Sequence, residues 1–486
     1  MDGALVTTPV LVPLATALLA AVFGEQRAVQ RVLALVGAAT LLACNVVLLA
    51  QVRAQGAQHV ALGNWPAPFG IELVADPLGA TMALITGAMG LATVVYMASD
   101  ADFGRDSATR IPLVFALLAG VGGAFVTGDI FNLYVWFELM LVAALGLLAH
   151  GKGTRNLEAT LKYFVLNVLG TLLFLMGVAY LYAATGHLGF GALSEAVREL
   201  EPGQWVPFVV VIVLAALVKA GAFPVFSWLP ASYHTLPAPL LALFAGLLTK
   251  VGVYTVLRLL GDVFVQTPEV VFDALAVVAV PTMIFGVLGA AYHWDIRRIL
   301  AFHSLSQIGY MLLGISLASP AGYAGTLVYV VHHAIVKANL FLVAGIVFRL
   351  TGSYDLRRCG GLYAARPLVA LLFGVSALAL VGIPPSSGFW AKFLVVRETL
   401  VQGHVALAVV ALSVGLLTLY SMMKIWFQAF WKKHPDPDWS PPSDARLGPA
   451  VFVTAIFAGL ALAIGIWPEG VIALAQEAAA SFGGGS

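Results

Sequence analysis

The chain has 486 residues, of which 61% are hydrophobic and only 10% are charged. Soluble globular domains carry about 25% charged residues, so this composition excludes an ordinary soluble protein and indicates an integral membrane protein. The formal net charge of +1 also argues against a nucleic-acid partner.

Apolar runs of about 20 residues, the length that a helix needs to cross a bilayer, recur along the whole chain. We predict fourteen spans, at residues 4–23, 28–50, 72–98, 111–128, 130–149, 160–184, 205–228, 236–259, 268–291, 298–317, 322–350, 367–395, 405–431 and 448–467. The longest polar connections are about 53–70, 185–204 and 432–447. An acidic residue and no basic run precede the first span, which favours a retained helix over a signal peptide. The sequence therefore predicts an all-α polytopic membrane protein.

Lysine and arginine are distributed unevenly between the two sides of these spans. The loops after even-numbered spans hold only Arg53, Arg198, Arg258 and Arg397. The loops after odd-numbered spans hold Arg27, Arg31, Arg105, Arg110, Lys152, Arg155, Lys162, Arg297, Arg298, Arg349, Arg357, Arg358, Arg366, Lys432, Lys433 and Arg446. Because basic residues are retained on the cytoplasmic side, we predict that the odd-numbered loops are cytoplasmic and that both termini lie outside.

Three residues recur at a constant offset of 166 positions, on spans 6 and 11. They are Tyr163, Thr185 and Gly186, which return as Tyr329, Thr351 and Gly352. Spans 7 and 12 are both broken by proline, at Pro224 in the first case and at Pro384 and Pro385 in the second. Spans 4–8 and 9–13 are therefore predicted to be two copies of one five-helix unit. An odd number of spans inverts one copy relative to the other, which is typical of transporters.

This repeat divides the chain into four parts. Residues 1–110 hold spans 1–3, residues 111–262 hold the first repeat, residues 263–433 hold the second repeat, and residues 434–480 hold span 14. Residues 481–486 resemble a flexible linker remnant and are left out of the fold prediction.

Five of the nine lysines lie in or at the edge of apolar spans: Lys219, Lys250, Lys337, Lys392 and Lys424. A charged residue at mid-membrane costs roughly 2.5–3.5 kcal/mol to insert. Unlike arginine, a buried lysine is able to release its proton. Extension of the side chain to the headgroups suits Lys424 and partly suits Lys392, but Lys219, Lys250 and Lys337 lie about ten or more residues from their span ends. We interpret these three as proton-transfer groups.

Glu138 is the only acidic residue deep within a span. We predict that it pairs with Lys219, because an ion pair keeps the lysine charged and its separation frees the proton. Asp76 and Asp129 lie near span ends and are interpreted as helix caps or interfacial groups.

Two histidines and a lysine are close together on span 11. His333 and Lys337 are four residues apart and share a helix face, so we predict that they relay protons. His332 points about 100° away and is expected to pack or to form a hydrogen bond. His303, on span 10, is equally compatible with the relay and with a satisfied core histidine. Haem ligation is poorly supported, because nothing marks a porphyrin site.

Lys392 follows the break at residues 382–388 and is predicted to be the outer end of a path. That path runs through Lys219, Lys250, His333, Lys337 and Lys392. The two cysteines match no metal or redox spacing and are interpreted as inert thiols. We predict no metal and no cofactor.

At these positions the chain resembles the antiporter-like subunits shared by respiratory complex I and Mrp-type multisubunit Na+/H+ antiporters. The matching stretches are NLYVWFE around Glu138, LVKAGAFPVFSWLP around Lys219, GLLTKVGVYTVLRL around Lys250, DIRRILAFHSLSQIGYM from Asp295 and HAIVKANLFLVAG from His333. They cover roughly residues 70–430. Residues 63–80 and the segment WLPASYHTLPAP are more similar to the D-type members of the Mrp group. Complex I members usually carry an acid and a histidine after WLP, where this chain has Ser232 and Tyr233.

The resemblance implies a fourteen-helix subunit with two inverted five-helix units. It places Glu138, Lys219, Lys250, His333, Lys337 and Lys392 in the proton pathway. Some members carry a lysine at the position of Lys392, where others carry glutamate. The implied partners are the other Mrp subunits, in a hetero-oligomer that exchanges H+ and Na+ across a bacterial cytoplasmic membrane. The chain stops soon after span 14 and lacks the long lateral helix of the largest members.

The sequence therefore predicts a proton-conducting subunit of a cation/proton antiporter, a secondary transporter and not an enzyme. A pump module of complex I or of a membrane hydrogenase is the first alternative. A structural membrane subunit with relic charges is the second.

Overall fold

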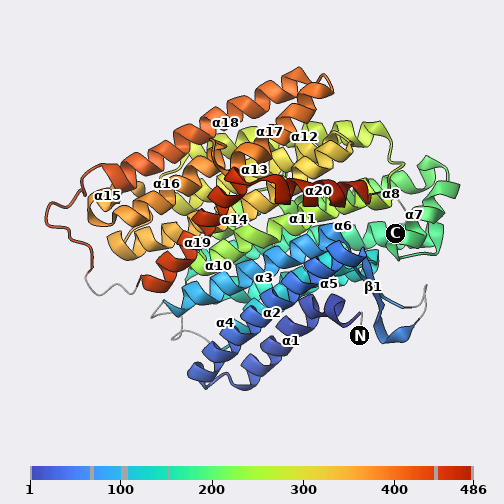
Figure 1. Ribbon diagram of the computed structural model, residues 1–486, viewed down its shortest axis with the longest axis horizontal. Coiled ribbons are helices and arrows are strands. Elements are labelled where there is room, and N and C mark those ends of the chain that lie inside the picture. The colour runs from blue at the N-terminus through green and yellow to red at the C-terminus, as the bar shows by residue number, and fades with distance from the viewer. Residues whose placement is uncertain (1–2, 66–69, 100–107, 152, 443–446, 483–486) are drawn as a thin grey trace.

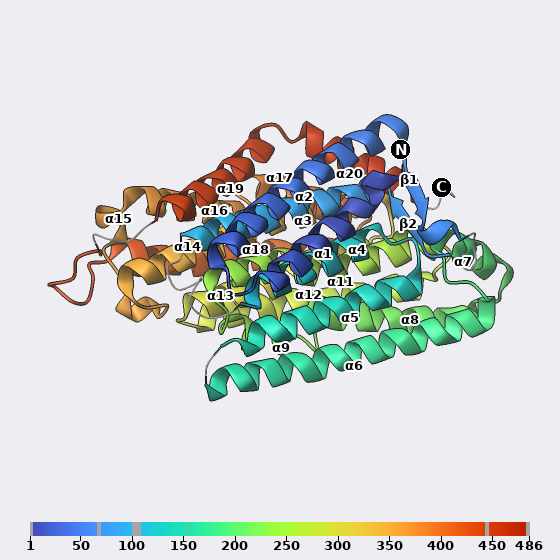
Figure 2. The same cartoon turned by 90° about the horizontal axis from the view of Figure 1, so that it is seen from below.

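The computed structural model describes residues 3–65, 70–99, 108–151, 153–442 and 447–482. Arg105, Lys152, Arg446 and residues 483–486 of the predicted linker remnant lie outside this described part. The described chain forms an elongated bundle in which most helices run along one direction (Figures 1 and 2). The pair of strands β1 (Gln58–Ala61) and β2 (Glu72–Ala75) lies with α7 (Phe190–Ala196) at one end of the bundle, and α15 (Leu362–Ala365) lies at the opposite end.

The membrane-crossing elements follow the predicted spans in order. They are α1 (Ala4–Val22), α2 (Arg27–Gln55), α3 (Pro77–Ala98), α4 (Arg110–Val126), α5 (Ile130–Ala149), α6 (Thr154–Thr185), α8 (Pro202–Ala220) with α9 (Trp228–Tyr233), α10 (Ala238–Leu243) with α11 (Thr249–Arg258), α12 (Glu269–Tyr292), α13 (Ile296–Ser316), α14 (Pro320–Thr351), α16 (Pro367–Val381) with α17 (Ser387–Val401), α18 (Val405–Ile425) and α19 (Gly448–Ile466). A last helix, α20 (Glu469–Ala480), packs against α14 and α3.

Within the described residues, twelve helical segments are long and apolar enough to cross a membrane. Two shorter apolar helices, Arg110–Val126 and Pro367–Val381, supply predicted spans 4 and 12. The prediction of an all-α, multi-pass membrane protein is confirmed. The outer layer of the bundle includes α1, α2, α6, α12, α18 and α19, whose apolar windows are at most 39% buried. The window of Ala238–Val263 is wholly buried, so this segment forms the core together with α13 and α14.

The predicted polar connection at 53–70 is only partly correct. Helix α2 continues to Gln55, and β1 (Gln58–Ala61) then pairs antiparallel with β2 (Glu72–Ala75). Predicted span 3 therefore starts too early. Its helix begins at Pro77, because Asp76 accepts a hydrogen bond from the Gly79 N–H and caps the first turn. The connection at 185–204 likewise contains α7 and a 3₁₀ turn, η2 (Val197–Glu199).

The offset of 166 residues recurs in the hydrogen bonds. Thr185 Oγ1 donates to the Leu181 carbonyl at 2.7 Å, and Thr351 Oγ1 donates to the Val347 carbonyl at 2.9 Å. Each threonine precedes a glycine with positive φ that ends the helix.

The loops that flank these helices repeat in the same way. An isolated bridge joins Asp129 to Gly189 in the first unit, and its equivalent joins Asp295 to Asp355 in the second. Asp129 and Asp295 both cap the helix that follows, α5 and α13. These matched contacts support the two predicted copies, whose boundaries remain a prediction.

Both predicted helix breaks occur. Helix α8 ends at Gly221 and α16 ends at Gly382, with φ of +75° and +94°. The peptide bonds Phe223-Pro224 and Pro384-Pro385, which follow these glycines, are cis. Each broken span then continues as a second helix, α9 or α17.

Candidate functional site

Lys219 lies in the last turn of α8, immediately before the break. Its ammonium nitrogen is 5.5 Å from the centroid of the Phe137 ring on α5. The neighbouring Glu138 acts electrostatically on Lys219. No direct ion pair joins the two residues within the described part of the chain. The predicted partners are therefore close together, but they are not in contact.

Helix α11 approaches α8 closely at Gly252, two residues after Lys250. A Cβ added at Gly252 would lie 2.4 Å from the backbone nitrogen of Ala220 and 2.6 Å from the backbone oxygen of Ala216. Only a residue without a side chain permits this approach. The helix that carries Lys250 is thereby held against the helix end that carries Lys219.

We expect Gly252→Val to lower the thermal unfolding midpoint of the purified protein, because the two helices must separate and repacking costs about 1–3 kcal/mol. The matched control is Gly459→Val on α19, where nothing lies within 4 Å of the added Cβ. Equal midpoints for the two variants would show that the close approach is unimportant.

Lys250 is fully buried near the start of α11. The preceding turn, η3 (Phe244–Leu248), is a π-helix, a geometry that disturbs the regular pairing of backbone carbonyls. The Lys250 ammonium donates to the carbonyl of Ala245 in this turn and to Thr249 Oγ1 at 3.4 Å. The irregular turn therefore supplies an acceptor for the lysine in the centre of the protein.

His333 and Lys337 lie one turn apart on α14, and both are fully buried. Neither ring nitrogen of His333 has a hydrogen-bond partner among the described residues, nor has the ammonium of Lys337. Lys250 acts electrostatically on both residues. The structure thus brings Lys250, His333 and Lys337 together in one central cluster.

Further buried polar atoms without a partner line α13 and α14, which pack against each other. In the described residues these atoms are Nδ1 of His303, Oγ of Ser306, Nε2 of Gln307, Nε2 of His332 and Oδ1 of Asn339. Buried polar groups in native proteins are almost always satisfied, by ordered water where no protein group serves. We therefore interpret the surroundings of these α13 and α14 side chains as a polar layer that water can enter, beside the central cluster.

His303 and His332 connect this layer to the outer helices of the second unit. The Nε2 atom of His303 lies 2.7 Å from Ser421 Oγ on α18, and Nδ1 of His332 lies 2.8 Å from Ser387 Oγ on α17. The predicted hydrogen bond of His332 is therefore present. Within the described chain His303 is satisfied at one nitrogen only, so it is not a fully satisfied core histidine.

Lys392 lies on α17 after the second break, as predicted. Its ammonium donates to the Val381 carbonyl at 2.7 Å and lies 5.1 Å from the centroid of the Tyr310 ring. It also lines a largely apolar hollow of about 690 Å³ beside α18. Both broken spans therefore carry a lysine near the break: Lys219 belongs to the last turn of the first half-helix, α8, whereas Lys392 belongs to the second half-helix and its ammonium reaches the C-terminal carbonyl of α16, which carries partial negative charge.

One sequence interpretation needs correction. Arg258, which we counted among outer-loop arginines, is buried on α11. It forms a bidentate ion pair with Asp76 at 2.6 and 2.7 Å and a second pair with Asp262 at 2.7 Å. Lys424 donates to the carbonyl of Ala291, near the end of α12, and to that of His293, which follows the helix.

A tyrosine pair was missed by the sequence reasoning. Tyr329 donates to Gln307 Oε1 at 2.5 Å and stacks on Tyr310 with a centroid separation of 5.4 Å. Tyr329 belongs to the 166-residue repeat, and that signal could have pointed to it. The two tyrosines therefore lie between Gln307, which accepts from Tyr329, and Lys392, whose ammonium contacts the Tyr310 ring.

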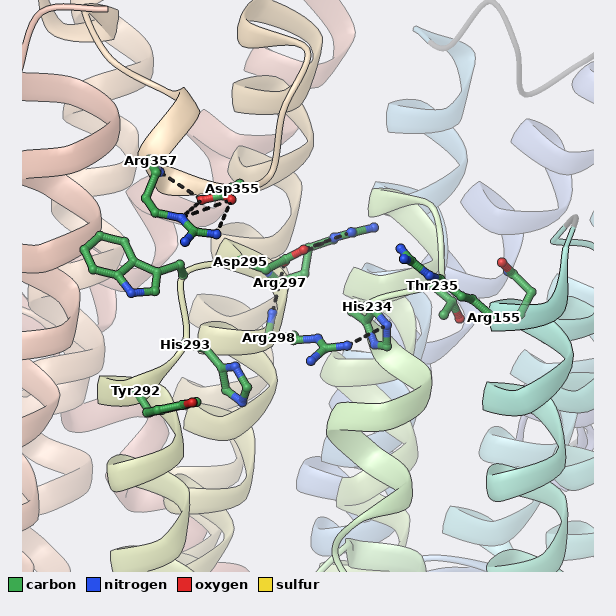
Figure 3. Close-up of a pocket in the computed structure, with 12 residues that line it drawn as sticks. Arg155, His234, Thr235, Tyr292, His293, Asp295, Arg297, Arg298, Asp355 and Arg357 are labelled. Atoms are coloured by element: carbon green, nitrogen blue, oxygen red, sulfur yellow. Dashed lines mark hydrogen bonds and ion pairs between the residues drawn. The ribbon is translucent and has the colours of Figure 1, made fainter. Parts of the chain in front are cut away.

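A polar cavity of about 810 Å³ opens between the two units, away from these lysines (Figure 3). Burial, and then the charge of Arg298, hold the pKa of His234 and of His293 below the usual range. A hydrogen bond from Arg357 holds the pKa of the Asp355 carboxyl below its usual range. At neutral pH both imidazoles are therefore uncharged, and the carboxylate is ionised.

The central arrangement is suited to moving protons. It offers amines and imidazoles that accept and release protons, next to buried polar atoms with no hydrogen-bond partner among the described residues. No cluster of three or more His, Cys, Asp or Glu placed to hold a metal ion occurs in the described ranges. The chemistry supported by these side chains is proton transfer between buried groups.

Comparison with known proteins agrees with this geometry. Residues 127–418 match the family described as NADH:quinone oxidoreductase/Mrp antiporter, TM. The D-type subunit of the Na(+)/H(+) antiporter of Alkalihalophilus pseudofirmus is 41% identical over 435 residues, covering 89% of this chain and 88% of that protein. The D-type subunit of the Na(+)/H(+) antiporter of Bacillus subtilis is 35% identical over 477 residues, covering 98% and 96%.

Solved structures give the same result. A chain in the structure of the Mrp complex from Dietzia sp. DQ12-45-1b is similar with a TM-score of 0.91 and 30% identity, covering 99% of this chain and 97% of that chain. A chain of the membrane-bound sulfane sulfur reductase, an archaeal respiratory membrane complex, has a TM-score of 0.88 at 23% identity, covering 98% and 97%. The second likeness shows a shared fold.

Proposed function

The chain belongs to the NADH:quinone oxidoreductase/Mrp antiporter transmembrane family, and from that membership we propose that it is the proton-translocating subunit of a multisubunit Na+/H+ antiporter. Its partners are the other Mrp-type subunits, and it acts as a transporter subunit and not as an enzyme. It lies in a bacterial cytoplasmic membrane with both termini outside. Support for the assembly comes from relatives that are antiporter subunits and from the similar chain in the Mrp complex.

The observation that carries this proposal is the central cluster of Lys250, His333 and Lys337. Three protonatable side chains are wholly buried, and two of them have no hydrogen-bond partner among the described residues. Burial without partners is unfavourable for stability, so these groups are better explained by function than by structure.

In the proposed mechanism the proton path begins at the pair formed by Glu138 and Lys219. Glu138 holds Lys219 protonated when the two approach each other. When they separate, as in this structure, Lys219 passes its proton to Lys250 through water near the contact of α8 and α11. The lysine then requires less stabilisation from the carboxylate, because it has become neutral.

The proton next moves from Lys250 through His333 and Lys337 to Lys392. We place His303 and the pair of Tyr310 and Tyr329 on this last step, because both Lys337 and Lys392 act electrostatically on His303 and the Tyr310 ring contacts Lys392. Proton flow down the electrochemical gradient is worth about 2.3 kcal/mol per charge per 100 mV. That free energy drives Na+ export elsewhere in the complex.

Vesicles that contain the assembled complex test the proposal. We expect Lys219→Ala and Glu138→Ala each to lower Na+-dependent proton exchange by about 10²-fold or more, the usual effect of losing a proton-transfer group. The matched control is Lys162→Ala with Glu158→Ala, an exposed ion pair at 2.5 Å on α6. Full exchange in both Lys219→Ala and Glu138→Ala would refute the mechanism.

A pump module of a redox enzyme is the remaining candidate from another class, because the family also includes NADH:quinone oxidoreductase subunits. The more similar relatives, at 41% and 35% identity, are antiporter subunits and favour the antiporter. Copurification with iron–sulfur or flavin subunits would favour the redox enzyme instead.

A further inference from the structure

The polar cavity described above is formed by both units. Arg155 reaches it from α6 and His234 from the end of α9, in the first unit. Arg298 reaches it from α13 and Arg357 from the 3₁₀ turn η5 (Leu356–Arg358), in the second unit. Figure 3 shows Arg298 and His234 meeting across the gap. A molecule bound here would contact both halves of the protein.

The charges around the cavity are unbalanced. Two of its four arginines are paired, Arg297 with Asp295 and Arg357 with Asp355. The other two arginines have no carboxylate partner among the described residues. Arg298 donates to Nε2 of His234 at 3.3 Å, and Arg155 makes no hydrogen bond or ion pair within the described ranges. Two guanidinium groups are therefore available to an anion, and guanidinium is the side chain best matched to phosphate oxygens.

The cavity continues into a second hollow of about 430 Å³, which shares Arg155, His234, His293 and Arg298. One side of this hollow is apolar, formed by Phe226, Pro230, Ala231 and Phe302, and the exposed ion pair of Glu158 and Lys162 lines it as well. The site therefore combines a cationic mouth with a groove that has an apolar wall. A free inorganic anion would use the mouth only, whereas a lipid would use both.

The surroundings are those of a membrane interface. Tyr292 and Trp294, which line the cavity, are 78% and 39% exposed, and such aromatic residues collect at the level of the headgroups. On the membrane side, Phe226 lies in an aromatic group with Phe223 and Phe285, and Phe285 is 48% exposed. The arginines belong to loops predicted to be cytoplasmic, the side on which anionic lipids are exposed to basic segments.

We propose that this cavity binds an anionic phospholipid, with its phosphate between Arg155 and Arg298 and an acyl chain along Phe226 and Phe302. The bound lipid ties α6 and α9 of the first unit to α13 of the second. Basic pockets between transmembrane helices on the cytoplasmic side bind anionic headgroups in other membrane proteins.

The full-length chain, purified in dodecyl maltoside, is titrated with dioleoylphosphatidylglycerol in mixed micelles, and the thermal unfolding midpoint is recorded. We expect the lipid to raise the midpoint of the wild type, because it binds the folded state. In Arg155→Gln/Arg298→Gln the half-saturating lipid concentration should increase about tenfold or more, as expected for lost charge-assisted hydrogen bonds. Arg155→Gln alone, which breaks no contact between described residues, should show a smaller increase.

The matched control is Arg31→Gln/Arg358→Gln, which removes the same charge from two exposed arginines of the same predicted side, outside the cavity. It should titrate as the wild type does. Equal half-saturating concentrations in the two double variants would overturn the proposal, and so would equal stabilisation by dioleoylphosphatidylcholine. Inorganic phosphate that stabilises the wild type as well as the lipid does would show a free-anion site instead. If Arg155→Gln/Arg298→Gln does not fold, an unchanged titration of Arg155→Gln overturns the proposal.

Discussion

Lys337→Met is expected to abolish ion exchange while raising the thermal unfolding midpoint. The Lys337 ammonium is fully buried and has no hydrogen-bond partner among the described residues. An unsatisfied buried polar group costs about 1–3 kcal/mol of stability. Methionine has a similar length, is unbranched and fills the same space without a polar end. The substitution should therefore stabilise the protein by a comparable amount.

Ion exchange should respond in the opposite direction. Without Lys337, His333 has no amine one turn away to which it can pass a proton, and we expect proton-coupled Na+ transport in vesicles to fall by about 10²-fold or more. Lys337→Arg should also be inactive, because a guanidinium does not release its proton. A substitution that raises stability and abolishes transport would show that the charge of Lys337 serves function and not folding.

The matched control is Thr326→Val, which removes another buried polar group from α14. Thr326 Oγ1 donates to the Gly322 carbonyl at 2.9 Å and to the Met311 carbonyl at 3.2 Å, so it is satisfied, and it precedes His333 on α14 by about two helical turns. This variant should lose stability and keep transport. Wild-type transport by Lys337→Met would show that Lys337 is a relic charge.

The positions of the spans could be predicted from the sequence because membrane crossing imposes a length and an apolar composition that are local properties. The caps at Asp129 and Asp295 are also local, since each side chain accepts from N–H groups within three residues. The predicted repeat depended on three matched residues and on the proline breaks in spans 7 and 12. In the structure it extends to a shared cap and a shared bridge, because the same local sequence folds in the same way twice.

The chemistry of the two units could not be predicted from their likeness. On α14 the repeat offset places His333 and Lys337 where α6 has Asn167 and Thr171. Asn167 donates to the carbonyl of Tyr163 within its own helix, whereas the α14 residues have no partner in the described chain. On these two matched helices, therefore, only α14 of the second unit carries buried protonatable groups, whereas the buried lysine of the first unit, Lys250, lies on a different helix, α11.

Contacts between distant segments also escaped prediction. The irregular turn at Phe244–Leu248 has no marker in its composition, yet it determines which carbonyl Lys250 meets. Asp76 was correctly interpreted as a cap, but its pairing with Arg258, 182 positions away, depends on how α3 packs near α11. The sequence analysis counted Arg258 among the arginines of the outer side because it lies near the end of its span.

Arg258→Ala is expected to have the largest effect on stability, a loss of about 3–5 kcal/mol. Arg258 is buried and makes a bidentate ion pair with Asp76 and a further pair with Asp262. Its Nε–H also donates a hydrogen bond to the Tyr254 hydroxyl at 3.2 Å. Its removal leaves the Asp76 carboxylate buried without a counter-charge. Because α11 also carries Lys250, the loss of this anchor should displace the central cluster and reduce transport as well.

A second variant separates the ion pair from the packing around it. Arg258→Gln/Asp76→Asn removes both charges, so no uncompensated carboxylate remains at the cap, and it should recover much of the stability lost in Arg258→Ala. Thermal unfolding of the purified chain in detergent measures both. The exposed pair of Arg53 and Glu477, at 3.7 Å, is the matched control, and Arg53→Ala should change stability by no more than about 1 kcal/mol. If Arg258→Ala lost no more stability than Arg53→Ala, the buried ion pair would not hold α3 to α11. The position of Lys250 would then have to be set by the close contact at Gly252 alone.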